Sequence, residues 1–196
     1  DRSMTNPPPI SCNCGCRGAD PLDTITLGPG RVVPLDEAIR QIISVGGNLK
    51  QVALLDNFCW GNPDKPDRLG GLVRTAEGCY KAAVAFGTPF ISGKDSLYNE
   101  YTEGGQSIAI PGTILISAIG IIDDVNKCIT MDLKKAGNVL YVVGETHDEM
   151  GGSIYSELNG TLGEHVPQVN FKKALVTFDA LSAAIAKGLV RSAHDC

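Results

Sequence analysis

Two short segments of the chain combine residue types that bind phosphate groups and metal ions. Asp56 directly follows the apolar run at residues 52–55, and residues 92–96 read Ser-Gly-Lys-Asp-Ser. A glycine lets a ligand approach the backbone closely, a carboxylate binds hard cations such as Mg²⁺, and an ammonium group or hydroxyl donates to phosphate oxygens. The second segment lacks the first glycine of the Gly-x-x-x-x-Gly-Lys-Ser/Thr phosphate loop, so that motif is excluded. Taken alone, residues 92–96 are explained about as well by a surface turn, and Asp56 by a carboxylate that caps the loop through hydrogen bonds from nearby amides.

The elements around these segments predict that the two lie side by side. Residues 52–55 form a continuous apolar run typical of a buried strand, residues 72–86 carry apolar side chains at helical spacing, and residues 89–91 begin a second strand. A helical connection implies that the two strands are parallel. Ligands gather at the carboxyl ends of parallel strands. We therefore expect the loops that begin at Asp56 and Ser92 to share one ligand, a nucleotide triphosphate with its Mg²⁺.

The remaining elements follow from the same periodicities, and together they predict a mixed α+β or α/β fold. Residues 1–34 hold six of the eleven prolines and are expected to be an irregular lead-in. Further elements are predicted as a helix at 35–45 stopped by Gly46 and Gly47, one or two strands within 108–122, a strand at 138–143, a helix capped by Asn170 and ending near Gly188, and a strand opening at 189–193. Because the chain stops at Cys196 without a closing element, we expect it to be a fragment of a longer polypeptide.

Composition excludes several classes of protein. The 196 residues include 17 Lys plus Arg against 22 Asp plus Glu, and 43% are hydrophobic. This mild acidity argues against nucleic-acid binding, and the ordinary hydrophobic content argues against a disordered chain. The longest apolar run, residues 113–122, is too short to cross a bilayer, and the first residues contain no apolar signal core. A soluble cytoplasmic protein is expected.

The other residues that could carry chemistry give weaker signals. Cys12, Cys14 and Cys16 form a cluster, but no second pair of ligands follows at zinc-site spacing, so reduced thiols are preferred over a metal site. We expect the aromatic rings of Phe58 and Trp60 to anchor a loop in the core rather than stack on a base. Two further carboxylates, Glu100 and Glu103, are interpreted as solvated surface groups.

Residues 54–101 closely resemble the synthetase part of the phosphoribosylformylglycinamidine synthase family, within the aminoimidazole ribonucleotide (AIR) synthetase superfamily. Two signatures occur in the family's order: Asp-x(4)-Gly-Asn-Pro beginning at Asp56, and Ser-Gly-(Lys/Asn)-x-Ser-x-Tyr-Asn-Glu beginning at Ser92. Similarity continues through residues 123–146 and 151–155 toward the end of the chain. A match this long, with both motifs in order, is not explained by chance.

The resemblance implies a domain organisation. The family's synthetase contains two copies of an A-plus-B unit, and this chain is similar to the second copy. Residues 35–125 would be its AIR synthetase-like A domain, whose sheet pairs with that of the first copy to form a barrel. Residues 126–196 would be the start of its α/β B domain, cut short. The partners implied are the rest of the synthetase chain and a glutaminase domain or subunit.

The resemblance also implies a reaction and roles for individual residues. ATP would phosphorylate the amide oxygen of formylglycinamide ribonucleotide, and ammonia from glutamine would displace the phosphate. Carried over by position, Asp56 and the backbone of Gly93 would contact ATP, and Ser96 would contact the substrate. Lys94 occupies the position of the family's Mg²⁺-associated residue, often Asn. Because a protonated lysine cannot bind Mg²⁺, either Asp95 takes that role or Lys94 meets a phosphate directly.

Two alternatives stay open. The chain could belong to another ATP-using member of the superfamily, such as a selenophosphate synthetase or thiamine monophosphate kinase relative, although those tend to have Gly-Gly-Asp-Thr where residues 93–96 stand here. It could also be a non-catalytic half that holds a nucleotide structurally. The family's acid and base histidines, its other Mg²⁺ carboxylates and its glutaminase lie outside this sequence. Catalysis by the chain alone is therefore not expected.

Overall fold

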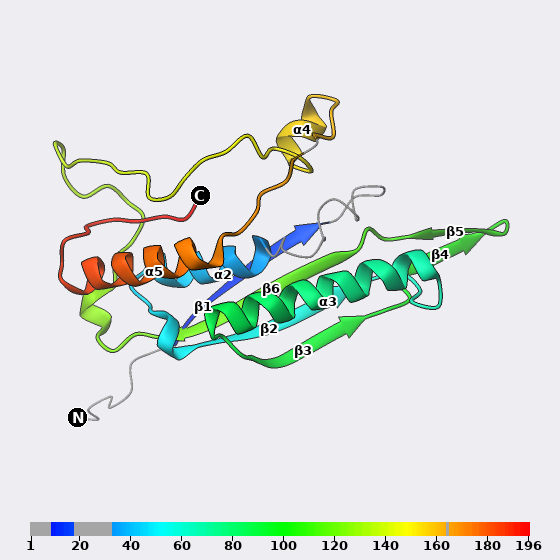
Figure 1. Ribbon diagram of the computed structural model, residues 1–196, viewed down its shortest axis with the longest axis horizontal. Coiled ribbons are helices and arrows are strands. Elements are labelled where there is room, and N and C mark those ends of the chain that lie inside the picture. Colours follow the sequence, from blue (N-terminus) through cyan, green and yellow to red (C-terminus); the bar gives the residue numbers. More distant parts are fainter. Residues whose placement is uncertain (1–8, 18–32, 164) are drawn as a thin grey trace.

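A mixed sheet covered by helices organises the protein (Figure 1). The computed structural model describes residues 9–17, 33–163 and 165–196, with the backbone alone for 9–17. Its elements are β1 (Pro9–Arg17), α2 (Val33–Ser44), β2 (Val52–Cys59), α3 (Pro66–Phe86), β3 (Phe90–Ser96), β4 (Glu100–Glu103), β5 (Gln106–Ala109), β6 (Thr113–Ile121), α4 (Ile154–Leu158) and α5 (Phe171–Ala186), with 3-10 turns at Leu49–Gln51 and Val125–Lys127.

The sheet has the strand order β1-β6-β2-β3. Strands β2 and β3, joined by α3, are parallel, which confirms the prediction of a helical crossover between parallel strands. Strand β6 runs antiparallel to both β1 and β2, so the sheet is mixed, as the expected fold class allows. Strands β4 and β5 form a separate antiparallel hairpin at one end of the molecule.

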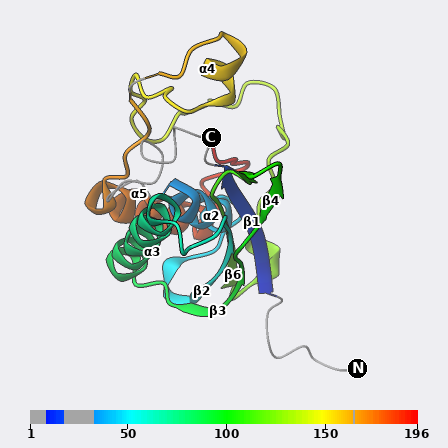
Figure 2. The same cartoon turned by 90° about the vertical axis from the view of Figure 1, so that its right-hand side faces the viewer.

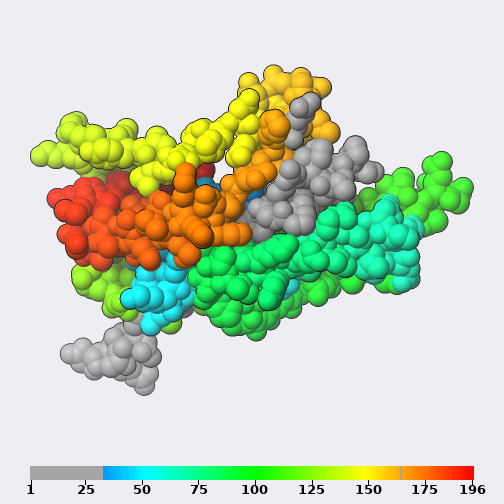
Figure 3. Space-filling view, viewed as in Figure 1, coloured from blue at the N-terminus to red at the C-terminus, as the bar shows by residue number. Residues whose placement is uncertain are grey.

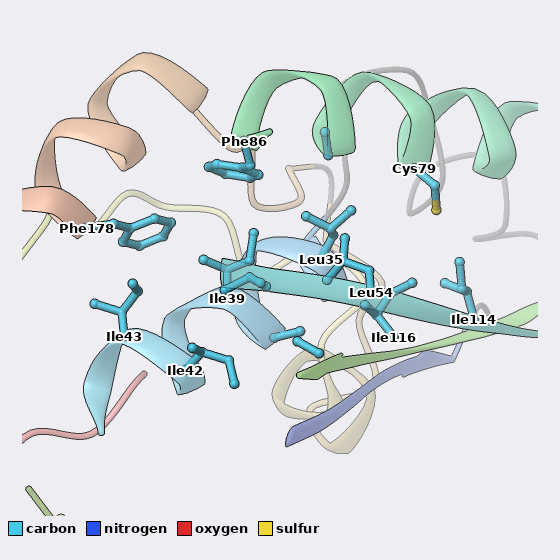
Figure 4. Close-up of a cluster of buried hydrophobic side chains, with 14 of the residues drawn as sticks. Leu35, Ile39, Ile42, Ile43, Leu54, Cys79, Phe86, Ile114, Ile116 and Phe178 are labelled. Carbon is cyan, nitrogen blue, oxygen red and sulfur yellow. The ribbon is translucent and has the colours of Figure 1, made fainter. Parts of the chain in front are cut away.

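The core lies between one face of this sheet and the helices α2, α3 and α5, which all lie on that side (Figure 2). Alternate residues of β2 and β6 point into it, as the period of two in a strand requires. Figure 4 shows these side chains meeting those of the helices. The largest fully buried hydrophobic residues are Leu35, Ile39, Ile42, Ile43, Leu54 and Ile116.

Helix α5 closes this core at one end. The ring of Phe86 on α3 lies 5.3 Å from that of Phe171 and 5.8 Å from that of Phe178 between ring centroids. The Ser182 hydroxyl donates a hydrogen bond to the carbonyl of Gly47. Helix α5 is therefore fixed to the loop after α2 as well as to α3.

The helix boundaries follow the predicted capping residues. Asn170 caps α5 by accepting a hydrogen bond from the Lys173 amide at 3.2 Å, as predicted. Gly87 adopts φ 69° at the end of α3, where the sequence placed the stop. Helix α3 begins at Pro66 rather than near residue 72, because proline is well suited to the first helical turn.

Four predictions of local structure are wrong. Residues 9–17 of the expected irregular lead-in form β1, which is defined by pairing with β6 rather than by an apolar pattern of its own. The loops expected to begin at Asp56 and Ser92 begin later, after Cys59 and Ser96, because the two strands continue to pair as far as those residues. Residues 138–143 and 189–193 form no strand, apart from a single bridge between Ser192 and Thr130, because no described strand pairs with them.

The other face of the sheet carries no helix (Figure 2). Its side chains from β2 and β6 are half-buried, among them Leu55, Leu115 and Ile119. Within the described ranges, no other layer of secondary structure packs on this face. The sheet therefore packs against helices on one side and presents both aliphatic and polar side chains on the other.

Residues 131–163 lie along the upper side of the molecule in the view of Figure 3. Many apolar side chains of this segment are exposed, including Leu140 (76% exposed) and Tyr141 (82% exposed). No helix of the described chain is long and apolar enough to cross a membrane. The predicted division of the chain at residues 125 and 126 stays a prediction.

Candidate functional site

The carboxylate of Asp56 lies directly over Gly93. The two residues are register partners on the parallel strands β2 and β3. A Cβ atom built on Gly93 would be 1.9 Å from Asp56 Oδ1, so only glycine leaves room for this carboxylate. The expectation that the two residues are side by side is confirmed, although both lie within strands rather than in loops.

The predicted site residues divide between the two faces of β3. Asp56 shares the face of Leu54 and Phe58, which points to the helices, and the negative charge of Asp95 acts on it from the same side. Lys94 and Ser96 alternate with Asp95, and the Lys94 ammonium donates a hydrogen bond to the Ser96 hydroxyl. Gly93 and Asp95 thus accompany Asp56, whereas the residue predicted to contact substrate lies on the opposite face.

Burial sets the charge behaviour of Asp56. Desolvation, followed by the nearby charge of Asp95, raises the pKa of Asp56 above its ordinary value, against hydrogen bonding to the backbone. On the facing helix, burial first and the charge of Asp56 second raise the pKa of the Cys79 thiol to about 12. Cys79 therefore remains a neutral thiol, as expected for a small core residue, and is not a nucleophile.

The two carboxylates of this face suit a Mg²⁺ ion that also binds phosphate. Mg²⁺ is usually held by one or two carboxylates together with waters and substrate phosphates. Asp56 and Asp95 are two such groups on neighbouring strands. Lys94 offers no metal ligand while it is protonated. Within the part of the chain that the structure describes, no group of three or more His, Cys, Asp and Glu residues is placed to hold a metal ion without such a phosphate.

Aromatic residues fix the segment that follows β2. Phe58 and Trp60 are buried, with ring centroids 6.3 Å apart, and the Trp60 indole donates a hydrogen bond to the Arg68 carbonyl at 2.9 Å. The expectation that these rings serve as anchors is confirmed. The Trp60 amide also donates to the Ser96 carbonyl at 2.8 Å, which joins the end of β2 to the end of β3.

A second cluster, around Glu100, was not predicted. Glu100 was expected to be a solvated surface carboxylate, and that is wrong, since its side chain is only 10% exposed. It accepts hydrogen bonds from the Lys65 ammonium at 2.6 Å, the Ser107 hydroxyl at 2.7 Å and the Asn62 amide at 2.8 Å. Its partners lie in other segments of the chain, and the only signal in the sequence is that Asn62 falls within the first motif and Glu100 ends the second.

The cysteine cluster falls outside the described side chains. Cys12, Cys14 and Cys16 lie on β1, for which the backbone alone is described, so the choice between thiols and a metal site stays a prediction.

The side chains of Lys94 and Asp95 are exposed, because β3 is the edge strand of the sheet. A ligand lying along that edge is within reach of both faces of the strand.

The chain is similar in sequence to known proteins. No family model matches the chain. The chain is 36% identical over 170 residues to the phosphoribosylformylglycinamidine synthase subunit PurL of Methanocaldococcus jannaschii, covering 85% of this chain and 23% of that subunit. It is 37% identical over 161 residues to PurL of an Anaeromyxobacter species, covering 82% of this chain and 20% of that subunit. The chain thus spans less than a quarter of the length of these curated relatives.

Solved structures agree with the sequence relatives. Thermotoga maritima PurL complexed with ADP matches with a TM-score of 0.51 and 25% identity, covering 66% of this chain and 20% of that chain. The hydrogenase maturation protein HypE in complex with ATP matches with a TM-score of 0.52 and 19% identity, over 81% of this chain and 43% of that chain, and it supports the fold alone.

This mixed sheet with helices on one face, together with the likeness to PurL and HypE, places the chain among the AIR synthetase-like folds. Within that class, the sequence relatives decide the family. The chain belongs to the phosphoribosylformylglycinamidine synthase family, and it corresponds to one segment of the PurL subunit.

Proposed function

We propose that this chain forms part of the active site of an ATP-dependent carbon-nitrogen ligase of purine biosynthesis. The complete enzyme converts formylglycinamide ribonucleotide, glutamine and ATP to formylglycinamidine ribonucleotide, glutamate, ADP and phosphate. The observation that carries the proposal is the Asp56 carboxylate held over the bare backbone of Gly93. Relatives complexed with ADP, with AMPPCP and with FGAR agree with a nucleotide and a substrate of this kind.

The residues of the site have different proposed roles. Asp56 and the Gly93 backbone bind ATP, and Asp95 stands beside Asp56 to hold the Mg²⁺ that neutralises charge on the transferred phosphoryl group. Lys94 places a positive charge beside Ser96, the residue proposed to contact the substrate. Because β3 is an edge strand, nucleotide and substrate are able to meet at that edge from its two faces.

The outer face of the sheet, which carries no helix, is proposed to pack against the first A-plus-B copy of the synthetase. Its half-buried side chains, Leu55, Leu115 and Ile119 among them, suit a second sheet rather than water. In this proposal residues 35–125 are the A domain and residues 126–196 begin the B domain. A glutaminase domain or subunit supplies ammonia, and the enzyme acts in the cytoplasm.

One observation favours a second function. The Lys94 ammonium donates a hydrogen bond to the Ser96 hydroxyl, and Lys94 stands at the position of the family's Mg²⁺-associated residue, often Asn. If the Ser96 hydroxyl is bound to Lys94 and the Lys94 ammonium takes the place of a metal ligand, the unit would hold a nucleotide structurally without catalysing its reaction. Activity measurements on variants separate this function from the catalytic one.

The test is to replace Asp56 with Ala in the complete enzyme that carries this sequence. We expect ADP and ATP binding, measured by calorimetry, to weaken by about tenfold or more and synthetase turnover to fall with it, because a contact to the nucleotide is lost. Asp179→Ala, on the exposed side of α5, is the matched control and leaves both unchanged. Unchanged turnover in a folded Asp56→Ala enzyme would favour the structural, nucleotide-holding function.

A further inference from the structure

We propose that Glu100 is a positioning residue that holds the ends of β2 and β3 together, and so sets the place of Ser96 for the reaction; this inference rests on the proposed function. Glu100 opens β4 and lies four residues beyond Ser96. Its partners Asn62 and Lys65 lie between β2 and α3, and Ser107 lies on β5. One carboxylate thus joins the segments that follow both site strands.

The charge of Glu100 is strongly held. Hydrogen bonding from Lys65, followed by the Asn62 amide and Ser107, lowers the pKa of Glu100 to about 2. Lys65 also donates to the Ser107 hydroxyl at 2.8 Å, and the Arg68 guanidinium lies 3.7 Å from Glu100. Every oxygen of the carboxylate therefore has a donor or a positive group beside it. Such a network fixes geometry because each bond restricts the others.

Space for the carboxylate is reserved by Gly61. A Cβ atom built on Gly61 would lie 3.1 Å from Glu100 Oε2 and 2.8 Å from the Ala109 side chain. The loop backbone therefore approaches both Glu100 and the β4–β5 hairpin. The carboxylate sits between the loop and the hairpin, rather than pointing into solvent from either.

The turn between Ser96 and Glu100 depends on this attachment. Tyr98 has a φ of 66°, which is unfavourable for a bulky side chain, and it is the only residue other than glycine with a positive φ among those described. Its hydroxyl donates to Asp64 at 2.7 Å. The Asn99 amide donates to the Trp60 carbonyl at 2.9 Å, and the Asn99 side chain donates to the Ser96 carbonyl at 2.8 Å.

These contacts give Glu100 a role distinct from that of a residue in contact with substrate. Glu100 is the first residue after the strained turn, and the bonds of its side chain hold it in place. The Trp60 amide and the Asn99 side chain hold the Ser96 carbonyl. Asp56 and Gly93 lie further back along the strands, where the ladder between β2 and β3 holds them independently. Loss of the Glu100 charge should therefore displace Ser96 and spare the nucleotide contacts.

The experiment compares Glu100→Gln with Glu103→Gln in the complete enzyme. Glu103 is the matched control, because it is an exposed carboxylate on the same hairpin. We expect Glu100→Gln to lower kcat/KM for formylglycinamide ribonucleotide by about a hundredfold, as a small misplacement of a binding group does, while KM for ATP changes by less than about twofold. Lys65→Met should lower kcat/KM for formylglycinamide ribonucleotide to a similar extent, and Lys65→Arg should retain most of the parent value.

Equal losses for ATP and for the ribonucleotide would overturn the inference in favour of a general loss of structure, as would an unchanged kcat/KM in Glu100→Gln. Hydrogen exchange provides a readout that does not need activity. Glu100→Gln should speed exchange at the amides of Trp60 and Asn99 but not at that of Leu54, and Glu103→Gln should speed none of them. A parent enzyme without ligase activity contradicts the proposed function, and hydrogen exchange alone then decides whether Glu100 fixes these segments.

Discussion

Two regions of this chain carry comparable apolar sequences, but one is buried and the other is exposed. Along β2, residues of the apolar run alternate between the core and the outer face, and Leu54 is fully buried. Along residues 138–143, an equally apolar run is exposed from end to end. The difference is the presence of neighbours, because β2 is paired with a strand on each side and its core face packs against side chains of the helices (Figure 4). An apolar run becomes a strand only where the described chain supplies partners for its backbone and its faces.

The largest effect expected from this comparison is on stability. Leu54→Ala should lower the free energy of unfolding by about 3 kcal/mol, through lost burial and the cavity left behind. Leu140→Ala should change it by less than about 0.5 kcal/mol, since the Leu140 side chain is 76% exposed. Urea unfolding followed by circular dichroism measures both. A cost for Leu140→Ala equal to that of Leu54→Ala would mean that residues 138–143 are packed in solution.

A smaller effect is expected at the cap of α5, the element that joins the later part of the chain to the core. Asn170→Ala should cost about 1 kcal/mol, because the Lys173 amide loses its acceptor. Asn138→Ala, in the exposed segment, should cost much less. Thermal unfolding of the two variants checks this ordering. Equal shifts of the midpoint would contradict the importance of the cap.

A further effect is confined to acid pH. The pKa of Glu100 falls from 4.5 to about 2 on folding, so the folded state binds the proton less tightly than the unfolded state. Stability from this group is complete above about pH 4.5 and is lost as the pH falls toward 2. In Glu100→Gln the part of the acid destabilisation due to this group should vanish. Chemical unfolding midpoints between pH 5 and 2 for the parent and Glu100→Gln measure it, and parallel curves would contradict it.

Much of the fold was predictable because its signals are local. The Asn170 cap, the Gly87 stop and the parallel crossover from β2 to β3 follow from residue types and spacing, and the structure confirms them. The strand in the lead-in was not predictable, because β1 exists through its pairing with β6 rather than through its own pattern. Pairing between distant segments leaves little trace in a single sequence.

The candidate site divides in the same way. Asp56 and Gly93 were expected to be adjacent, since parallel strands in sequence order fix that relation, and they are. The separation of Ser96 from Asp56 follows from side-chain alternation, which applies only once residues 92–96 are known to be a strand rather than a loop. Glu100 was misjudged because its partners Asn62, Lys65 and Ser107 come from other segments.

The position of Trp60 has a practical consequence. It is the only tryptophan in the sequence, and its buried indole lies where the segments after β2 and β3 meet. Intrinsic fluorescence of this protein therefore arises, as far as tryptophan is concerned, from a single known place beside the candidate site. Any ligand that shifts these segments changes the emission of one ring, so the site contains its own optical reporter and needs no added dye.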